Sequence, residues 1–122
     1  MNTQSMNILY LIRRLPYSGT RALETLDAIL VGAVFEQSIS VLFADDGVWQ
    51  LRQQQNTARA GLKNIAQQLS VMPEYEIESL YVCEASLKAR NLSLDALCLP
   101  LSPLSYAAQI ELIRGAEVVI ND

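Results

Sequence analysis

Short apolar runs alternate with segments of helical pattern along the whole chain, and this alternation restricts the fold more than any single motif. Runs that are apolar throughout are typical of strands buried on both faces. Such strands separated by helices predict an α/β protein, a three-layer α/β/α structure around a five-stranded parallel sheet. No linker or repeat divides residues 1–122, so we expect a single domain. The strands are expected over Met6–Ile12, Ile39–Ala44, Glu76–Val82, Ala96–Leu99 and Glu117–Ile120.

The segments between these runs place apolar residues at helical spacing. Thr20, Thr57 and Ser105 stand where a side-chain oxygen caps the first N–H groups of a helix. In the last of these helices, Ile110 and Ile113 are expected to face inward. We expect helices over residues 20–37, 58–69 and 84–90, and a last helix that is capped by Ser105 and has Gly115 just past its end.

One cysteine, Cys83, lies where the third strand passes into the third helix. Backbone N–H groups at a helix start favour negative charge, so a thiol there tends toward the reactive thiolate. The chain has no histidine, which makes Cys83 the only strong candidate nucleophile. A free cysteine is also often a buried residue that only fills space, so both interpretations stay open. Cys98, in an apolar run, is expected to lie in the core.

Charged residues follow the first two strands, at the sheet edge where open parallel sheets generally carry their function. Paired carboxylates at Asp45 and Asp46 are able to hold Mg²⁺, but a role in a turn is favoured, because two arginines end the first strand. No glycine-rich phosphate loop is present, and the absence of histidine removes histidine-dependent catalysis and zinc sites. We therefore assign no metal or cofactor site. The residues expected at this edge are Arg13, Arg14, Tyr17, Asp45, Asp46 and Cys83.

The composition indicates a protein that binds other proteins. Apolar residues make up 51% of the chain and charged residues only 18%, so part of the apolar surface is expected to face a partner. We take Val48, Trp49 and Leu51 as a candidate interface. A net charge of −4 argues against direct binding of nucleic acid. Two free thiols without a signal peptide indicate the cytoplasm, and no apolar run is long enough to span a membrane.

Three segments give the chain a resemblance to a known family. They are Pro-Tyr-Ser-Gly-Thr at 16–20, Asp-Asp-Gly-Val-Trp-Gln-Leu at 45–51, and Val-Cys-Glu-Ala-Ser-Leu-Lys-Ala-Arg-Asn-Leu at 82–92. Together they resemble the DsrE/DsrF family, and within it the TusC/DsrF branch. The second segment is the most specific, and the resemblance covers essentially the whole chain. It implies a flavodoxin-like architecture with the strand order 4-3-2-1-5.

The resemblance also implies a function. A TusC-type chain is a subunit of a heterohexamer built from two TusB–TusC–TusD trimers. That complex takes persulfide sulfur from a TusA-like protein and passes it toward a TusE-like protein for 2-thiolation of the tRNA wobble uridine. The acting cysteine is credited to the TusD-type subunit, so the resemblance implies a noncatalytic, structural role for this chain, without a cofactor.

Three alternatives stay open. The first is a DsrF-type subunit of a DsrE–DsrF–DsrH complex in sulfur oxidation. The second is a sulfurtransferase in which Cys83 carries the persulfide, because this residue aligns with the sulfur-bearing cysteine of TusD-type subunits. The third is a stand-alone flavodoxin-like domain that binds a small molecule.

Overall fold

The protein forms one parallel β-sheet between two layers of helices. The computed structural model describes residues 6–15, 21–53 and 65–122. Within them the strand order is β4-β3-β2-β1-β5, and every neighbouring pair is parallel, so the expected sheet and its order are confirmed. The strands are β1 (Asn7–Ile12), β2 (Ser38–Phe43), β3 (Ser79–Cys83), β4 (Ser102–Leu104) and β5 (Val118–Asn121).

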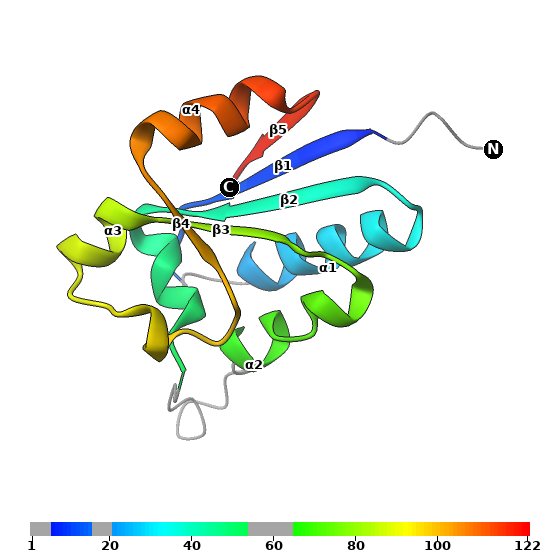
Figure 1. Cartoon of the computed structure of the whole chain (residues 1–122). Coiled ribbons are helices and arrows are strands. Elements are labelled where there is room, and N and C mark those ends of the chain that lie inside the picture. Colours follow the sequence, from blue (N-terminus) through cyan, green and yellow to red (C-terminus); the bar gives the residue numbers. More distant parts are fainter. Residues whose placement is uncertain (1–5, 16–20, 54–64) are drawn as a thin grey trace.

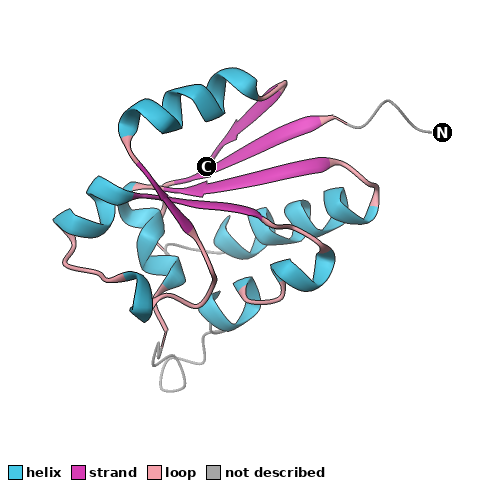
Figure 2. Cartoon of the chain, viewed as in Figure 1, coloured by secondary structure: helices cyan, strands magenta, loops and turns pink. Residues whose placement is uncertain are grey.

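Helices cover both faces of the sheet (Figures 1 and 2). The α-helices are α1 (Arg21–Val34), α2 (Ile65–Leu69), α3 (Glu84–Ala89) and α4 (Tyr106–Gly115). Three 3₁₀ segments accompany them: η1 (Asp45–Leu51), η3 (Met72–Tyr75) and η4 (Leu94–Ala96). Figure 1 places α1 and α2 on one side of the sheet and α4 on the other, with α3 at one end of the strands. No described helix is long and apolar enough to cross a lipid bilayer.

Two helix ends follow their sequence signals, whereas α1 ends at Val34, before the expected Gln37, and α4 includes Gly115. The Ser105 hydroxyl caps α4 by accepting the N–H of Ala108 at 3.2 Å, as expected. Asn91, beyond the end of α3, has a φ of 59°, the left-handed conformation that asparagine tolerates. The caps expected at Thr20 and Thr57, and positions 58–64 of the expected second helix, lie outside the described residues.

Side chains of the central strands alternate between two environments, because successive strand residues point to opposite faces. Tyr10, Val41 and Phe43 belong to the main hydrophobic core, which includes buried residues of α1 and α2. Leu42 and Cys83 line a cavity on the α4 side instead. The α4 side carries the candidate site.

The fourth strand was expected at Ala96–Leu99, and that prediction is wrong. Ala96 ends η4, and Leu97 forms only an isolated antiparallel bridge with Arg52. The strand comes after Pro100 and contains Pro103, which pairs with Val82. Proline is tolerated on an edge strand because its missing N–H can face away from the sheet. The sequence pattern suggested that the prolines end the fourth strand, but Pro100 precedes it and Pro103 lies within it.

The candidate interface at 48–51 is corrected for two of its residues. Val48 and Leu51 are 0% exposed and belong to the main core, so neither can contact a partner in this conformation. Trp49 is half-buried and stays a candidate. The segment is a 3₁₀ helix, in which residues three apart share a face. This geometry places Val48 and Leu51 together against the core.

Candidate functional site around Cys83

Cys83 lies at the floor of a cavity at the carboxyl ends of the strands. It is the last residue of β3 and the N-cap of α3, and its residue surface is 1% exposed. The cavity has a volume of about 290 Å³. Its walls come from β1, β2, the residues that directly follow these strands, η1 and α4: Leu11, Arg13, Leu42, Ala44, Asp45, Tyr106, Gln109, Ile110 and Ile113. The expected strand-to-helix position of Cys83 is confirmed.

A chain of hydrogen bonds connects η1 to the sulfur through Ser86. The backbone N–H of Asp45 donates to the Ser86 hydroxyl at 2.9 Å, and the Ser86 side chain is hydrogen-bonded to Cys83. Asp45 has a φ of 51°, in the left-handed region that aspartate tolerates. Because the hydroxyl accepts from Asp45, its own proton is available for donation to the sulfur, and successive hydrogen bonds of this kind strengthen one another.

A second side chain reaches the sulfur from α4. Gln109 is 8% exposed, whereas the other described residues of α4 are half-buried or exposed. Its Nε2 donates to the carbonyl of Leu104 at 3.1 Å, and Leu104 is the sheet partner of Cys83. The Gln109 side chain also lines the same cavity as Cys83, and its hydrogen bonding is one of the causes that lower the pKa of the thiol. The thiol is therefore held between α3 and α4.

These contacts change the acidity of the thiol. Burial raises the pKa of Cys83, but hydrogen bonds from the side chains of Ser86 and Gln109 and from the backbone of Ser86 and Ala85 lower it, and the net result is a pKa below the ordinary value. Cys98 behaves in the opposite way, because burial raises its pKa to about 11. It is half-buried and packs against the main core, in a bend rather than the expected strand. The two thiols thus differ in their readiness to ionise.

The charged residues of the sheet edge separate into distinct contacts. Arg13 and Asp45 line the Cys83 cavity, as their position after the strands predicts. Asp46 instead accepts from Arg90 at 3.1 Å. No group of three or more His, Cys, Asp or Glu side chains that could hold a metal ion occurs within the part of the chain that the structure describes. Tyr17 lies outside the described residues.

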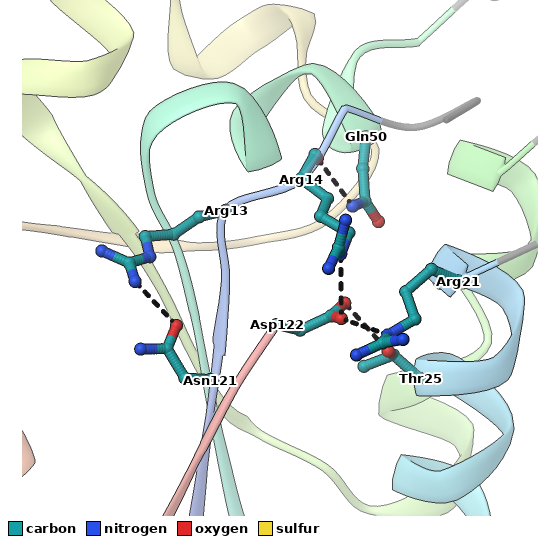
Figure 3. Close-up of polar contacts among 7 residues, drawn as sticks. All are labelled: Arg13, Arg14, Arg21, Thr25, Gln50, Asn121 and Asp122. Carbon is teal, nitrogen blue, oxygen red and sulfur yellow. Dashed lines mark hydrogen bonds and ion pairs between the residues drawn. The ribbon is translucent and has the colours of Figure 1, made fainter. Parts of the chain in front are cut away.

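Asp122 fixes the loop that follows β1 (Figure 3). Its carboxylate, 4% exposed, accepts from Arg14 at 3.3 Å, from Arg21 at 3.1 Å and from the Thr25 hydroxyl at 2.9 Å. These bonds join the end of β5 to the loop after β1 and to α1. Arg14 is thereby directed to Asp122 and is absent from the walls of the Cys83 cavity.

The neighbouring Arg13 donates to the side chain of Asn121 at 2.9 Å, also drawn in Figure 3. The buried Gln50 donates to the carbonyl of Arg14 at 3.0 Å. A contact with β5 therefore holds Arg13 at the cavity wall. Arg14 is held through its side chain by Asp122 and through its carbonyl by Gln50.

The outer part of α4 is apolar and open to solvent. Ile110 and Ile113 are 50% and 38% exposed, so the prediction that they face inward is wrong. They lie with Tyr106 on one side of the helix, at spacings of four and three residues, and all three line the mouth of the Cys83 cavity. We call Tyr106, Ile110 and Ile113 the α4 stripe. Val118, Val119 and Ile120 of β5 are also exposed.

Sequence reasoning missed Ser86 and Gln109 as residues of the site. Ser86 had a local signal, because residues at positions i and i+3 meet in the first turn of a helix that begins after Cys83. Gln109 had no local sequence signal, because its contact with Cys83 depends on how α4 packs near the end of β3.

The fold and the site define a class of protein: a three-layer α/β/α domain with a buried thiol at the carboxyl edge of its parallel sheet. Cys83 is its candidate nucleophile, and the described residues contain no nucleotide-binding loop. Residues 6–121 match the model of the DsrE/DsrF-like family, and the chain belongs to that family. The expected family is therefore confirmed.

Relatives from two branches are similar to the chain. A TusC homolog of Pseudomonas aeruginosa is 34% identical over 96% of this chain and 98% of that protein. The intracellular sulfur oxidation protein DsrF of Allochromatium vinosum is 43% identical over 73% of this chain, but the match spans only 65% of that longer protein. The crystal structure of the ychN protein from E. coli covers 96% of this chain and 99% of its own, with a TM-score of 0.80 at 17% identity, and it supports the fold alone.

Proposed function

We propose that the chain is a noncatalytic, complex-forming subunit of a sulfur-relay assembly. Its partners are TusB-like and TusD-like subunits in a heterohexamer, which exchanges sulfur with TusA-like and TusE-like proteins in the cytoplasm. The sulfur is passed on for 2-thiolation of the tRNA wobble uridine. The observation that carries this proposal is the nearly end-to-end match to a TusC homolog.

The surface supports assembly with other proteins. The α4 stripe and the exposed residues of β5 leave apolar side chains in water, and contiguous apolar patches mark interaction sites. The half-buried Trp49 is a second candidate contact. With nine Lys and Arg against thirteen Asp and Glu, the chain lacks the charge for phosphate binding, so tRNA contact falls to other proteins.

Co-expression tests the proposal. The chain is produced with TusB-like and TusD-like proteins of the same genome, and the mass of the purified complex is measured by native mass spectrometry. We expect a hexamer with two copies of each chain. A chain that purifies alone as a stable monomer, while its candidate partners assemble without it, contradicts the proposal.

A second candidate function follows from the surroundings of Cys83. Here Cys83 itself carries sulfur: its thiolate attacks the terminal sulfur of a partner's persulfide, the partner's S–S bond breaks, and the partner leaves as a thiolate. The product is a persulfide on Cys83, and no oxidant is consumed. The lowered pKa of Cys83 and its position in the lining of a cavity favour this candidate.

The similarity to DsrF favours a related assignment, a subunit of a DsrE–DsrF–DsrH complex in sulfur oxidation. The two pathways predict different partners. The chain is mixed separately with TusB-like and TusD-like proteins and with DsrE-like and DsrH-like proteins, and the set that forms a stable complex identifies the pathway.

A further inference from the structure

Gln109 is an unusual residue to bury on α4. A glutamine side chain is mostly found exposed, and burying a carboxamide is costly unless it is hydrogen-bonded. Yet Gln109 is the buried residue of α4, while the apolar side chains of the α4 stripe lie in solvent. This inverted pattern indicates that the carboxamide has a task on the inner side of the helix.

The geometry places that carboxamide beside the sulfur. The bond from Nε2 to the carbonyl of Leu104 fixes the side chain against β4, and Leu104 lies opposite Cys83 in the sheet register. Gln109 and Cys83 also line the same cavity. An amide nitrogen carries two N–H bonds, so the bond to Leu104 leaves the second one for another acceptor.

We propose that Gln109 is a positioning residue that presents an amide N–H to the Cys83 sulfur and makes the reactivity of the thiol depend on the placement of α4. A role of Gln109 in sulfur transfer rests on the second candidate function, in which Cys83 carries the sulfur. Ile110 of the α4 stripe is adjacent to Gln109, so a partner that covers the stripe contacts the helix that holds the sulfur.

Other ionisable groups face the same cavity and have to stay unchanged in the test. Arg13 comes from the end of β1, Asp45 from the start of η1 and Tyr106 from the start of α4. On α3, Lys88 and Glu84 pair with each other at 3.6 Å.

The test measures how fast iodoacetamide modifies Cys83 in the full chain across a pH series, with the modified peptide identified by mass spectrometry. The variant Gln109→Leu removes the amide and keeps a similar volume. Gln67→Leu makes the same chemical change on α2, on the opposite face of the sheet, and is the matched control. The midpoint of the profile reports ionisation, and its plateau at high pH reports access to the sulfur.

We expect Gln109→Leu to raise the midpoint and leave the plateau unchanged. Because hydrogen bonds to ionised groups are the strong ones, the rate at neutral pH should fall on the order of tenfold. The control should match the wild type. An unchanged midpoint, or a change in the plateau alone, overturns the inference, because a merely structural role alters access and not ionisation.

A second variant covers the case in which Gln109→Leu fails to fold. Gln109→Glu keeps the shape and replaces the amide N–H with a carboxylate, so it should raise the midpoint further. An unshifted midpoint in a folded Gln109→Glu chain also overturns the inference. If Gln109→Leu raises the midpoint of the alkylation profile but leaves sulfur transfer by the complex unaffected, the role of Gln109 in ionisation of Cys83 holds. The second candidate function, in which Cys83 carries sulfur, then fails.

Discussion

Asp45 and Ser86 are joined by a hydrogen bond of 2.9 Å from the backbone N–H of one to the hydroxyl of the other. This bond crosses from the start of η1 to the first turn of α3, and the same hydroxyl is hydrogen-bonded to Cys83. The sequence places the two residues 41 positions apart, but the parallel pairing of β2 and β3 brings the ends of both strands together. Ser86 therefore has a structural bond and a bond to the thiol.

Replacing Ser86 with alanine should affect both bonds. The pKa of Cys83 should rise, because a hydrogen bond that stabilises the thiolate is lost, and alkylation at neutral pH should slow. The part-buried N–H of Asp45 loses its acceptor, so the free energy of unfolding should fall by about 1 kcal/mol. Alkylation pH profiles and urea denaturation measure the two effects. A Ser86→Ala chain with wild-type values in both contradicts the network.

Gly47 allows η1 to pass close to the end of β1. A Cβ on Gly47 would lie 2.1 Å from the carbonyl oxygen of Ile12, so Gly47→Ala should destabilise the protein by about 3 kcal/mol or more. Gly115→Ala is the matched control, because its Cβ would meet no atom within 4 Å. Thermal denaturation of the two variants checks the contrast. Equal stability of the two would show that the close approach is absent.

Asp122 should contribute modest stability through its contacts with Arg14, Arg21 and Thr25. Asp122→Asn keeps the shape but removes the charge, and we expect a loss of about 1–2 kcal/mol, limited because both arginines are partly in water. Glu111→Gln, which breaks the exposed pair with Arg114, should change the stability by less than about 0.5 kcal/mol. Urea denaturation at low and high salt compares them. A larger loss for Glu111→Gln would contradict the assignment.

The α4 stripe should matter for assembly and little for folding. Ile110→Ser removes an exposed apolar side chain from its centre, so complex formation should weaken while the circular dichroism spectrum stays the same. Glu111→Ser, the next residue along α4, is the control for the helix. Analytical ultracentrifugation of the reconstituted complex measures the effect. Unchanged assembly in Ile110→Ser excludes the stripe as the contact surface.

The two cysteines should give opposite pH dependences of stability. The folded-state pKa of Cys83 is lowered, so its contribution is present above the unfolded pKa and is lost as the pH falls through the folded pKa. The pKa of Cys98 is raised from 9.0 to about 11, so its contribution is full below pH 9.0 and is lost as the pH rises toward 11. Cys98→Ala should therefore flatten the alkaline decline in denaturant midpoint. If the denaturant midpoint of Cys98→Ala declines at alkaline pH as it does in the wild type, ionisation of Cys98 is not the cause of the decline.

The fold could be predicted from the sequence wherever residues close together in the chain decide the structure. The continuous apolar runs predicted the central strands, and the position of Cys83 between a strand and a helix was readable directly. The edge strand β4 was not predicted, because at an edge proline is compatible with a strand. Ile110 and Ile113 had the right spacing, but spacing alone cannot tell whether the chain itself or a partner covers an apolar face. Gln109 was out of reach because its contacts are long-range.

We propose that this chain serves a sulfur relay as a subunit and not as a sulfur carrier. The most direct test is transfer of labelled sulfur from a TusA-like donor to a TusE-like acceptor through the reconstituted complex, with wild-type chain, with Cys83→Ser, or without the chain. Serine keeps the size of the residue but cannot hold a sulfane sulfur. We expect nearly unchanged transfer with Cys83→Ser and loss of transfer when the chain is left out. If the rate of sulfur transfer falls about tenfold or more with Cys83→Ser in an intact complex, the proposal is contradicted and Cys83 is established as the carrier.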